Sequence, residues 1–296
     1  MNILDALADL AARTQRPLGE VVRHYLLEGV LRRLAQSPWA ERFVLRGSML
    51  TRSWVPARVA QDLDFTSSTA LSVEETARHF LPLLRDDAAD DGLRFDNAAF
   101  RVIGIWQETA FPGVRLFLRV GLGAPNLSLS IDVGFRDPLV PPAEIVDYPS
   151  LIGPTFRTWC CRPETMLGWK LHGLAEMGER RWRPKDLYDL LLLGERFAPD
   201  ADVLAAAIAS AFTSRKYRVE DAAAVFSPAS WWATKRSQVR WDDFRRAGDG
   251  LDIPEDVTQV VARVAARLRP ALERLPACGL AVPSAKPQAA NPRISS

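Results

Sequence analysis

The four residues Asp62-Leu63-Asp64-Phe65 constrain the fold of this 296-residue chain more than any other segment. Polar and apolar residues alternate in it, and a period of two predicts a half-buried β-strand. Both carboxylates would then project from one face of the strand, while Leu63 and Phe65 face the core. Two carboxylates this close repel each other strongly unless a cation lies between them. The segment therefore predicts a cation site on a strand, and hard oxygen ligands favour Mg²⁺.

A Gly-Ser step at Gly47 and Ser48 precedes this strand, and residues 48–54 are expected to form a short helix. Glycine permits close approach of a ligand to the backbone, and free N–H groups at a helix start bind phosphate oxygens. A Gly-Ser step followed by a D-x-D strand is typical of the way nucleotidyltransferases hold a nucleoside triphosphate (NTP) and its Mg²⁺. Arg58, which lies four residues before Asp62, either contacts phosphate or pairs with an acid.

Three later segments are also expected to be strands, and the last of them carries a third carboxylate. The segments are residues 100–106, 114–120 and 127–133. We expect antiparallel pairing to bring Asp132 beside Asp62 and Asp64. Three carboxylates on one sheet face suit two-metal nucleotidyl transfer, because two can bridge the metals and the third can accept the proton of the attacking hydroxyl. The alternative is that Asp132 only stabilises a turn or pairs with an arginine.

Lys170 is the first lysine of a chain that is otherwise rich in arginine. A lysine in such a chain indicates a need for a compact point charge, as on a phosphate, rather than a planar fork. The alternative is a surface lysine with its stem packed on apolar neighbours. Further along, Lys185 and Asp186 precede Asp189, and the two aspartates share one face of a predicted helix. They can orient Lys170, contact a base or ribose, or cap the helix and pair with arginines; we expect Asp189, deeper in an apolar run, to be the inward, functional one.

The hydrophobic pattern changes from strands to helices across a proline-rich connector. We therefore expect an α/β (α+β) chain of two lobes, with a mixed β-sheet and N-terminal helices in residues 1–150 and helices in residues 151–275. Residues 276–296, rich in Ala, Pro and Ser, are expected to form a disordered tail. The first lobe has an excess of acidic residues, which suits metal–nucleotide chemistry there. The second lobe has an excess of basic residues, which suits binding of a polyanion.

The remaining composition excludes several classes of protein. No apolar run is long enough to span a bilayer, and the N-terminus lacks the basic-then-apolar order of a signal peptide. The three cysteines predict neither a disulfide framework nor a metal knuckle, which indicates a reducing compartment. The three histidines fit no zinc spacing and no serine-hydrolase triad. We expect a cytoplasmic protein that does not act on membranes.

Together these motifs resemble the AbiEii/AbiGii (MenT-like) toxin family of the polymerase-β-like nucleotidyltransferase superfamily. The resemblance rests on blocks in family order between about residues 40 and 195. The blocks are Phe-Val-Leu-Arg-Gly47-Ser48-Met-Leu, Arg58 through Asp62-Leu-Asp64-Phe, Leu-Ser-Ile-Asp132-Val-Gly-Phe-Arg-Asp-Pro, Pro-Glu164-Thr through Lys170, and Arg-Pro-Lys-Asp186-Leu-Tyr-Asp189. The chain departs from many relatives at Ser48, where they have Gly or Ala, and at Ala60, where they have Thr.

The resemblance implies a two-lobed nucleotidyltransferase fold with Mg²⁺ at Asp62 and Asp64. It also implies phosphate contacts from Ser48 and Lys170 and a catalytic role at Asp189. The implied reaction transfers the NMP of an NTP, with release of pyrophosphate, to an acceptor that in MenT-like members is the 3′ end of tRNA. Such proteins are toxins of toxin–antitoxin or phage-defence systems, so a cognate antitoxin is an expected partner.

The expected acceptor is RNA, because basic residues occur beside aromatic residues in the second lobe. The clusters are Arg180-Arg-Trp-Arg, Arg215-Lys-Tyr-Arg and Arg245-Arg. Each cluster taken singly also fits a solvated helix face. Two alternative functions use the same carboxylates: transfer to a small molecule or a protein hydroxyl, and NTP binding by a degenerate module without catalysis. The presence of all three carboxylates disfavours the last of these.

Overall fold

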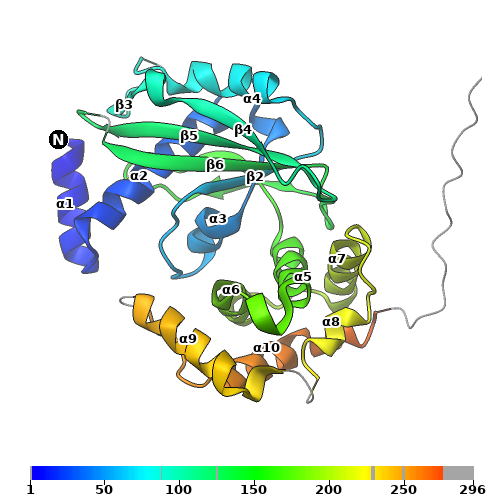
Figure 1. The fold of residues 1–296 in the computed structure, drawn as a ribbon. Coiled ribbons are helices and arrows are strands. Elements are labelled where there is room, and N and C mark those ends of the chain that lie inside the picture. Colours follow the sequence, from blue (N-terminus) through cyan, green and yellow to red (C-terminus); the bar gives the residue numbers. More distant parts are fainter. Residues whose placement is uncertain (1, 88, 125, 228–230, 249–250, 276–296) are drawn as a thin grey trace, which may run out of the picture.

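The computed structural model describes residues 2–87, 89–124, 126–227, 231–248 and 251–275. These residues form a sheet lobe and a helical lobe (Figure 1), so the expected α/β class with a mixed sheet and a helical lobe is confirmed. The tail predicted at 276–296 lies outside the described residues. No described helix is long and apolar enough to cross a membrane.

The described part of the sheet lobe is built on a mixed sheet of eight strands. The strands are β1 (Val44–Arg46), β2 (Leu63–Ser67), β3 (Leu93–Phe95), β4 (Arg101–Ile105), β5 (Gly113–Leu122), β6 (Leu127–Phe135), β7 (Glu144–Tyr148) and β8 (Phe156–Cys160). They lie in the order β3-β5-β6-β2-β1-β8-β7, and β4 pairs with β5. β2 lies between β1, to which it is antiparallel, and β6, to which it is parallel.

Four α-helices accompany the sheet in the described part of this lobe. They are α1 (Ile3–Thr14), α2 (Leu18–Ala35), α3 (Gly47–Trp54) and α4 (Val73–Phe80). A capping box opens α4, where the Ser72 hydroxyl accepts from the Glu75 N–H and the Glu75 carboxylate accepts from the Ser72 N–H. α3 packs on β1 and β2 and also contacts α6 of the helical lobe, which places it at the junction of the two lobes (Figure 1).

The helical lobe consists of α5 (Pro163–Arg181), α6 (Pro184–Arg196), α7 (Ala201–Thr213), α8 (Asp221–Ala224), α9 (Lys235–Ala247) and α10 (Val257–Leu272). Pro163 and Pro184 occupy the first turns of α5 and α6, where the missing N–H is not needed. α5 packs closely on α7 at Gly168, where a Cβ atom would lie 2.9 Å from the Ala207 carbonyl oxygen. This packing fixes α5, which carries Lys170, against the rest of the lobe.

Two strands that the sequence did not predict lie in and directly after the proline-rich connector. β7 pairs with β8, and β8 also pairs in parallel with β1 at the centre of the sheet. Because β8 ends at Cys160 and α5 begins at Pro163, the sheet lobe extends about ten residues beyond the expected boundary at residue 150. The polypeptide therefore passes from sheet to helices directly beside β1 and the Gly47-Ser48 step.

Candidate active site between the two lobes

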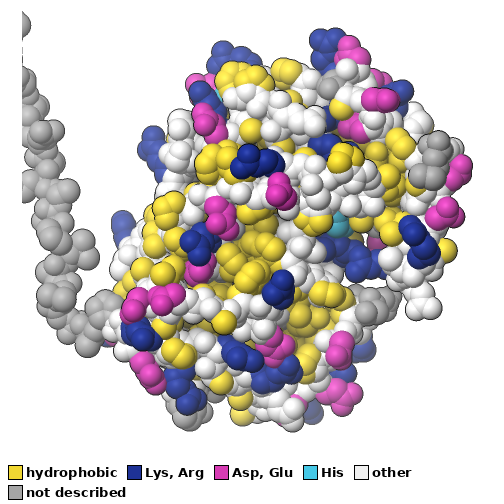
Figure 2. All heavy atoms as spheres, turned by 180° about the vertical axis from the view of Figure 1, so that it is seen from behind, with side chains coloured by type: hydrophobic (Ala, Val, Ile, Leu, Met, Phe, Trp, Pro, Cys, Tyr) yellow, Lys and Arg dark blue, Asp and Glu magenta, His cyan; other side chains and the backbone are white. Residues whose placement is uncertain are grey.

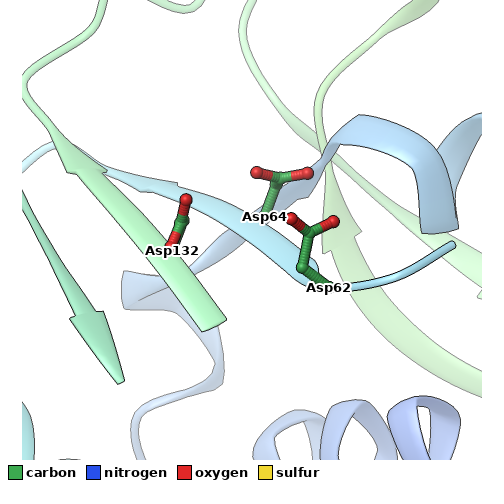
Figure 3. Close-up of side chains that lie close together, drawn as sticks. All are labelled: Asp62, Asp64 and Asp132. Atoms are coloured by element: carbon green, nitrogen blue, oxygen red, sulfur yellow. The ribbon is translucent and has the colours of Figure 1, made fainter. Parts of the chain in front are cut away.

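Three carboxylates from two neighbouring strands come together on one face of the sheet (Figure 3). Asp62 lies directly before β2, Asp64 lies in β2, and Asp132 lies in β6 as the register partner of Asp64. Each offers an oxygen atom within 4.8 Å of the others. The expected antiparallel pairing is wrong, because β2 and β6 run parallel. Direct partners in neighbouring strands project to the same face in either direction, so this carboxylate cluster (Asp62, Asp64, Asp132) forms nevertheless.

The electrostatics of the carboxylate cluster differ from one member to the next. Burial and the nearby charge of Asp62 raise the pKa of Asp64 to about 6, although Arg46 partly offsets them. Neither Asp62 nor Asp64 forms an ion pair with any described residue. Asp132 instead accepts two hydrogen bonds of 2.6 Å from Nε and Nη2 of Arg115 on β5. The arginine pairing considered as an alternative for Asp132 is therefore present together with the carboxylate cluster.

The Gly47-Ser48 step lies against the carboxylate cluster at the start of α3. Gly47 has φ of +74°, and a Cβ atom at this position would lie 2.1 Å from Oδ2 of Asp64. Only glycine can therefore bring the helix start this close to the carboxylate. Ser48 is buried, and its hydroxyl has no hydrogen-bond partner among the described residues. A helix start, whose first N–H groups have no partner within the helix, and an unpartnered hydroxyl beside paired carboxylates fit a Mg²⁺ ion with the phosphates of a nucleotide.

Lys170 projects from α5 on the opposite side of the cavity. Its Nζ lies 2.9 Å from Oδ1 of Asp186 and 2.7 Å from Oδ2 of Asp189, both on α6. Burial alone would lower the pKa of Lys170, but the charges of Asp186 and Asp189 outweigh burial and raise it. The Lys170 side chain is only 14% exposed and its ammonium contacts two buried carboxylates, which disfavours the alternative of a surface lysine with its stem packed on apolar neighbours. We call this group the lysine cluster (Lys170, Asp186, Asp189).

The two aspartates of the lysine cluster are both buried but have different surroundings. Asp186 lines the cavity and accepts a further hydrogen bond of 2.6 Å from Nε of Arg183. Burial alone would raise the pKa of Asp186, but Lys170 and Arg183 outweigh burial and lower it. Asp189 does not line the cavity; it lies behind Lys170 and is 3.7 Å from Nη2 of Arg58. Of the roles considered for the two aspartates, orienting Lys170 is the one that these contacts favour.

Arg58 and Lys185 complete the positively charged side of the cavity. Arg58 pairs with an acid, as one of its two alternatives proposed, and it also lines the cavity. Burial, with the nearby charge of Arg58, lowers the pKa of Lys185. The cavity has a volume of about 730 Å³ and is lined by both lobes. All predicted site residues except Asp189 therefore lie at one interlobe cavity.

Two of the three basic clusters reach this cavity. Arg183 lines it from the first cluster, and Arg215 and Tyr217 line it from the second. Arg245 of the third cluster pairs with Asp242 and Glu255 and does not line the cavity. On the back of the molecule, Lys and Arg side chains alternate with Asp and Glu side chains over both lobes (Figure 2). The positive charge that bears on the cavity therefore comes from its own lining residues, and the face seen in Figure 2 carries mixed charge.

Several residues that line the cavity are not predicted by the sequence motifs. Arg115 holds Asp132, Arg46 lies over the ring of Trp169 at 5.4 Å, and Trp106 lines the cavity from the turn after β4. Arg115 could have been found from its place on the polar face of the predicted strand 114–120, once that strand was paired with residues 127–133. Trp106 and Trp169 give no comparable signal, because single tryptophans are common in cores.

Comparisons with known proteins identify the family of the chain and support its fold. Residues 29–270 match the family described as nucleotidyl transferase AbiEii toxin, type IV TA system. No curated protein sequence matches the chain. The solved structure of JHP933 from Helicobacter pylori is similar with a TM-score of 0.52 and 15% identity, over 87% of this chain and 93% of that one. A provisionally assigned nucleotidyltransferase from H. pylori has a TM-score of 0.47 and 16% identity, over 85% and 94% of the two chains. The likeness to JHP933 supports the fold, and the family match spans both lobes and the whole carboxylate cluster.

Proposed function

The chain belongs to the AbiEii family of nucleotidyltransferase toxins of type IV toxin–antitoxin systems, and from this premise we propose that it transfers the NMP of an NTP to an RNA acceptor with the help of Mg²⁺. The carboxylate cluster carries the proposal. Its three oxygen atoms lie within 4.8 Å of one another, at a cavity whose opposite side supplies a buried lysine. This arrangement suits nucleotidyl transfer, which depends on positioning the reacting groups and on stabilising the charge of the phosphate oxygens in the transition state.

Asp62, Asp64 and Asp132 are the residues that would hold Mg²⁺. When bound, the ion neutralises charge on the phosphate oxygens and polarises the reacting phosphorus. The raised pKa of Asp64 supports this assignment, because a carboxylate that is costly to ionise beside Asp62 gains most from a cation. The absence of an ion pair to Asp62 or Asp64 from any described residue leaves their oxygen atoms free for this purpose.

The triphosphate is held between α3 and α5. The N–H groups of Gly47 and Ser48 and the buried Ser48 hydroxyl face the phosphates from one side. The ammonium of Lys170, fixed by Asp186 and Asp189, faces them from the other side as a point charge. Two fixed sets of donors hold the triphosphate in one orientation, which lowers the entropic cost of reaching the transition state.

The transfer forms one bond and breaks one bond. The acceptor hydroxyl oxygen bonds to the α-phosphorus, the bond from that phosphorus to pyrophosphate breaks, and the hydroxyl proton passes to Asp132. A carboxylate has about four lone-pair sites, and the hydrogen bonds from Arg115 occupy two of them. Arg115 therefore fixes the direction of the Asp132 carboxylate and leaves lone pairs for the proton.

RNA is the proposed acceptor because the cavity combines arginines with aromatic rings. Arg215 lies over the ring of Phe111 at 4.7 Å, and Arg46 lies over Trp169. Such pairs suit phosphates and unpaired bases at the end of an RNA strand. The 3′ end of tRNA is the expected target, and the protein that neutralises this toxin is its expected partner.

The experiment that tests the proposal incubates the purified protein with Mg²⁺, each labelled NTP in turn, and total cellular RNA. The expected result is label in RNA, dependent on Mg²⁺ and abolished by excess chelator. Label in a protein or in a small molecule instead would replace the RNA acceptor with the alternative acceptor class. Absence of label in a protein that still binds NTP with Mg²⁺ would support the alternative of a non-catalytic NTP-binding module, and absence of both would overturn the proposal.

A further inference from the structure

Trp106 is an exposed aromatic residue at the cavity. It follows β4, is 41% exposed, and lines the cavity. Its backbone has φ of +54°, a left-handed conformation that bulky residues rarely adopt. The proposed function gives it no role, and a large exposed aromatic in an unfavourable backbone conformation is a residue that folding alone does not explain.

The turn after β4 fixes Trp106 from both sides. The backbone N–H and the hydroxyl of Thr109 donate hydrogen bonds of 2.9 and 2.8 Å to the Trp106 carbonyl oxygen. The side-chain amide of Gln107 donates to the carbonyl oxygens of Ile105 and Gly113, at 3.2 Å each, and so ties the end of β4 to the start of β5. Trp106 is therefore presented to the cavity in a fixed position.

The indole of Trp106 lies against two glycines on the face of the sheet that carries the carboxylates. A Cβ atom on Gly113 would lie 3.2 Å from Cε3 of Trp106, and a Cβ atom on Gly134 would lie 3.8 Å from Cζ3. These glycines are register partners, two residues from the partners Arg115 and Asp132. Residues two apart in a strand share a face and are separated by roughly 7 Å. The indole thus lies over the position on β6 that follows Asp132 on the same face of the sheet.

Trp106 also differs from other aromatic residues of the cavity in its partners. Phe111 has Arg215 over its ring at 4.7 Å, and Trp169 has Arg46 at 5.4 Å. Trp106 has neither a stacked ring nor a cation over its ring among the described residues. It is an aromatic surface at the site that remains free to take a base.

The directions of the strands indicate whether Trp106 contacts the base of the NTP or the terminal base of the acceptor RNA. β1 is antiparallel to β2 with Arg46 opposite Asp64, so the Gly47-Ser48 step that follows β1 lies toward the Asp62 end of β2. Gly134 pairs with Thr66, beyond Asp64 in the other direction. Trp106 and the phosphate-binding step therefore lie on opposite sides of the carboxylate cluster. In phosphoryl-type transfer the attacking and leaving oxygens are roughly in line, so the acceptor enters opposite the departing pyrophosphate.

We propose that Trp106 stacks against the terminal base of the RNA acceptor and positions the end of the strand for attack. This inference rests on the proposed function of the same cavity. Stacking does not read hydrogen-bonding edges, so Trp106 would tolerate different terminal bases but would require that a base be present.

The test uses the full chain and compares the KM for an acceptor RNA, at saturating NTP, with the KM for the NTP, at saturating RNA. Trp106→Ala is expected to raise the KM for RNA about tenfold, the scale of one base stacked on an aromatic side chain, and to leave the KM for NTP unchanged. Trp106→Phe is expected to restore most of the affinity. Ile103→Ala is the matched control, because Ile103 is 44% exposed on β4 and does not line the cavity.

An acceptor RNA that lacks only its terminal base completes the experiment. The wild type is expected to lose about as much affinity for this RNA as Trp106→Ala loses for the intact RNA, and Trp106→Ala is expected not to distinguish the two RNAs. An unchanged KM for RNA in Trp106→Ala would overturn the inference while the proposed function stands. A raised KM for NTP alone would overturn it by assigning Trp106 to the nucleotide base. A wild type that labels no RNA would overturn both.

Discussion

The two sides of the cavity balance their charges in opposite ways. The carboxylate cluster places three acids together, and only Asp132 has a cationic partner among the described residues. The lysine cluster places one buried ammonium between two buried acids and contains its own counter-charges. Accordingly, the pKa of Asp64 is raised to about 6, whereas the pKa of Asp186 is lowered. The sheet side is thus left with uncompensated negative charge and is in this sense incomplete, whereas the helical side balances its charges as folded.

The largest expected effect follows from removing a member of the incomplete side. Asp64→Ala should abolish NMP transfer and cellular toxicity, because loss of a metal ligand removes several kcal/mol of transition-state stabilisation, about 10³-fold or more in rate. The fold should persist, because no described residue forms an ion pair with Asp64. Label transfer, toxicity on induction and thermal unfolding measure these outcomes. Asp147→Ala, on exposed strand β7, is the matched control. A well-folded Asp64→Ala protein that is still toxic would contradict the comparison.

The lysine cluster should respond in stability as well as in activity. Lys170→Ala leaves Asp186 and Asp189 buried without their ammonium, and breaking a buried pair in this way costs about 3–5 kcal/mol. Urea unfolding at neutral pH measures the loss. Lys235→Ala, at the exposed start of α9, is the control. If Lys170→Ala were as stable as Asp64→Ala, the two sides would not differ in the way described.

Lys170→Arg separates the charge from its geometry. Arginine keeps the positive charge between the two acids, so most of the stability should remain. The planar guanidinium cannot place a point charge where the ammonium lies, so turnover should fall about tenfold or more. Steady-state label transfer provides the measurement, and turnover close to that of the wild type would remove the argument for a compact charge.

Much of the cavity could be predicted from local patterns. Alternation in Asp62–Phe65 and in residues 127–133 determines which side chains share a face of the sheet. The carboxylates share one face as the alternation predicts, although β2 and β6 pair in parallel. The pairing direction could not be predicted, because it depends on how residues 68–126 cross the sheet. β7 and β8 were missed because each has only five residues and lies among prolines that indicated an extended connector.

The residues of the lysine cluster were identified, but their arrangement was not. Helical spacing placed Asp186 and Asp189 on one face, and it could not determine which of them borders the cavity. The answer depends on the packing of α5 against α6, which brings Nζ of Lys170 between them. Asp186 is the one that lines the cavity, although Asp189 was favoured because of its apolar neighbours.

The next effect is the contribution of Asp64, in the carboxylate cluster, to the pH dependence of stability. In metal-free protein, Asp64 keeps its proton up to a pKa of about 6, whereas the unfolded chain releases it near 3.8. The unfolded state thus binds fewer protons between about pH 4 and 6, and Asp64 lowers the free energy of unfolding as the pH rises through that range. Asp186, with its lowered pKa, acts in the opposite sense, and its contribution is lost only below about pH 4.

Comparing Asp64→Asn with the wild type isolates this contribution. His24 and His172, whose pKa values burial lowers to about 4, titrate in the same window with the opposite sign, so the slope of one protein alone is not diagnostic. Without metal, Asp64→Asn should gain up to about 3 kcal/mol over the wild type between pH 4 and 7. Saturating Mg²⁺ should remove the gain. Urea unfolding with chelator across this range measures it, and a constant difference between the two proteins would refute the assignment.

The smallest effect concerns Arg115, which among the described residues is the one that forms an ion pair with the carboxylate cluster. Arg115→Gln removes this charge from Asp132 and should tighten Mg²⁺ binding. The side chain is 38% exposed, so the effect is screened to about 1 kcal/mol or less, which is about fivefold in affinity. Turnover should nevertheless fall, because Asp132 loses the two hydrogen bonds that fix its direction.

Arg115→Lys keeps the positive charge without the two-pronged guanidinium and should leave Mg²⁺ affinity near the wild-type value. Mg²⁺ titration of the thermal midpoint distinguishes the three proteins; weaker binding in Arg115→Gln would mean that Arg115 serves the metal site by orientation and not by opposing its charge.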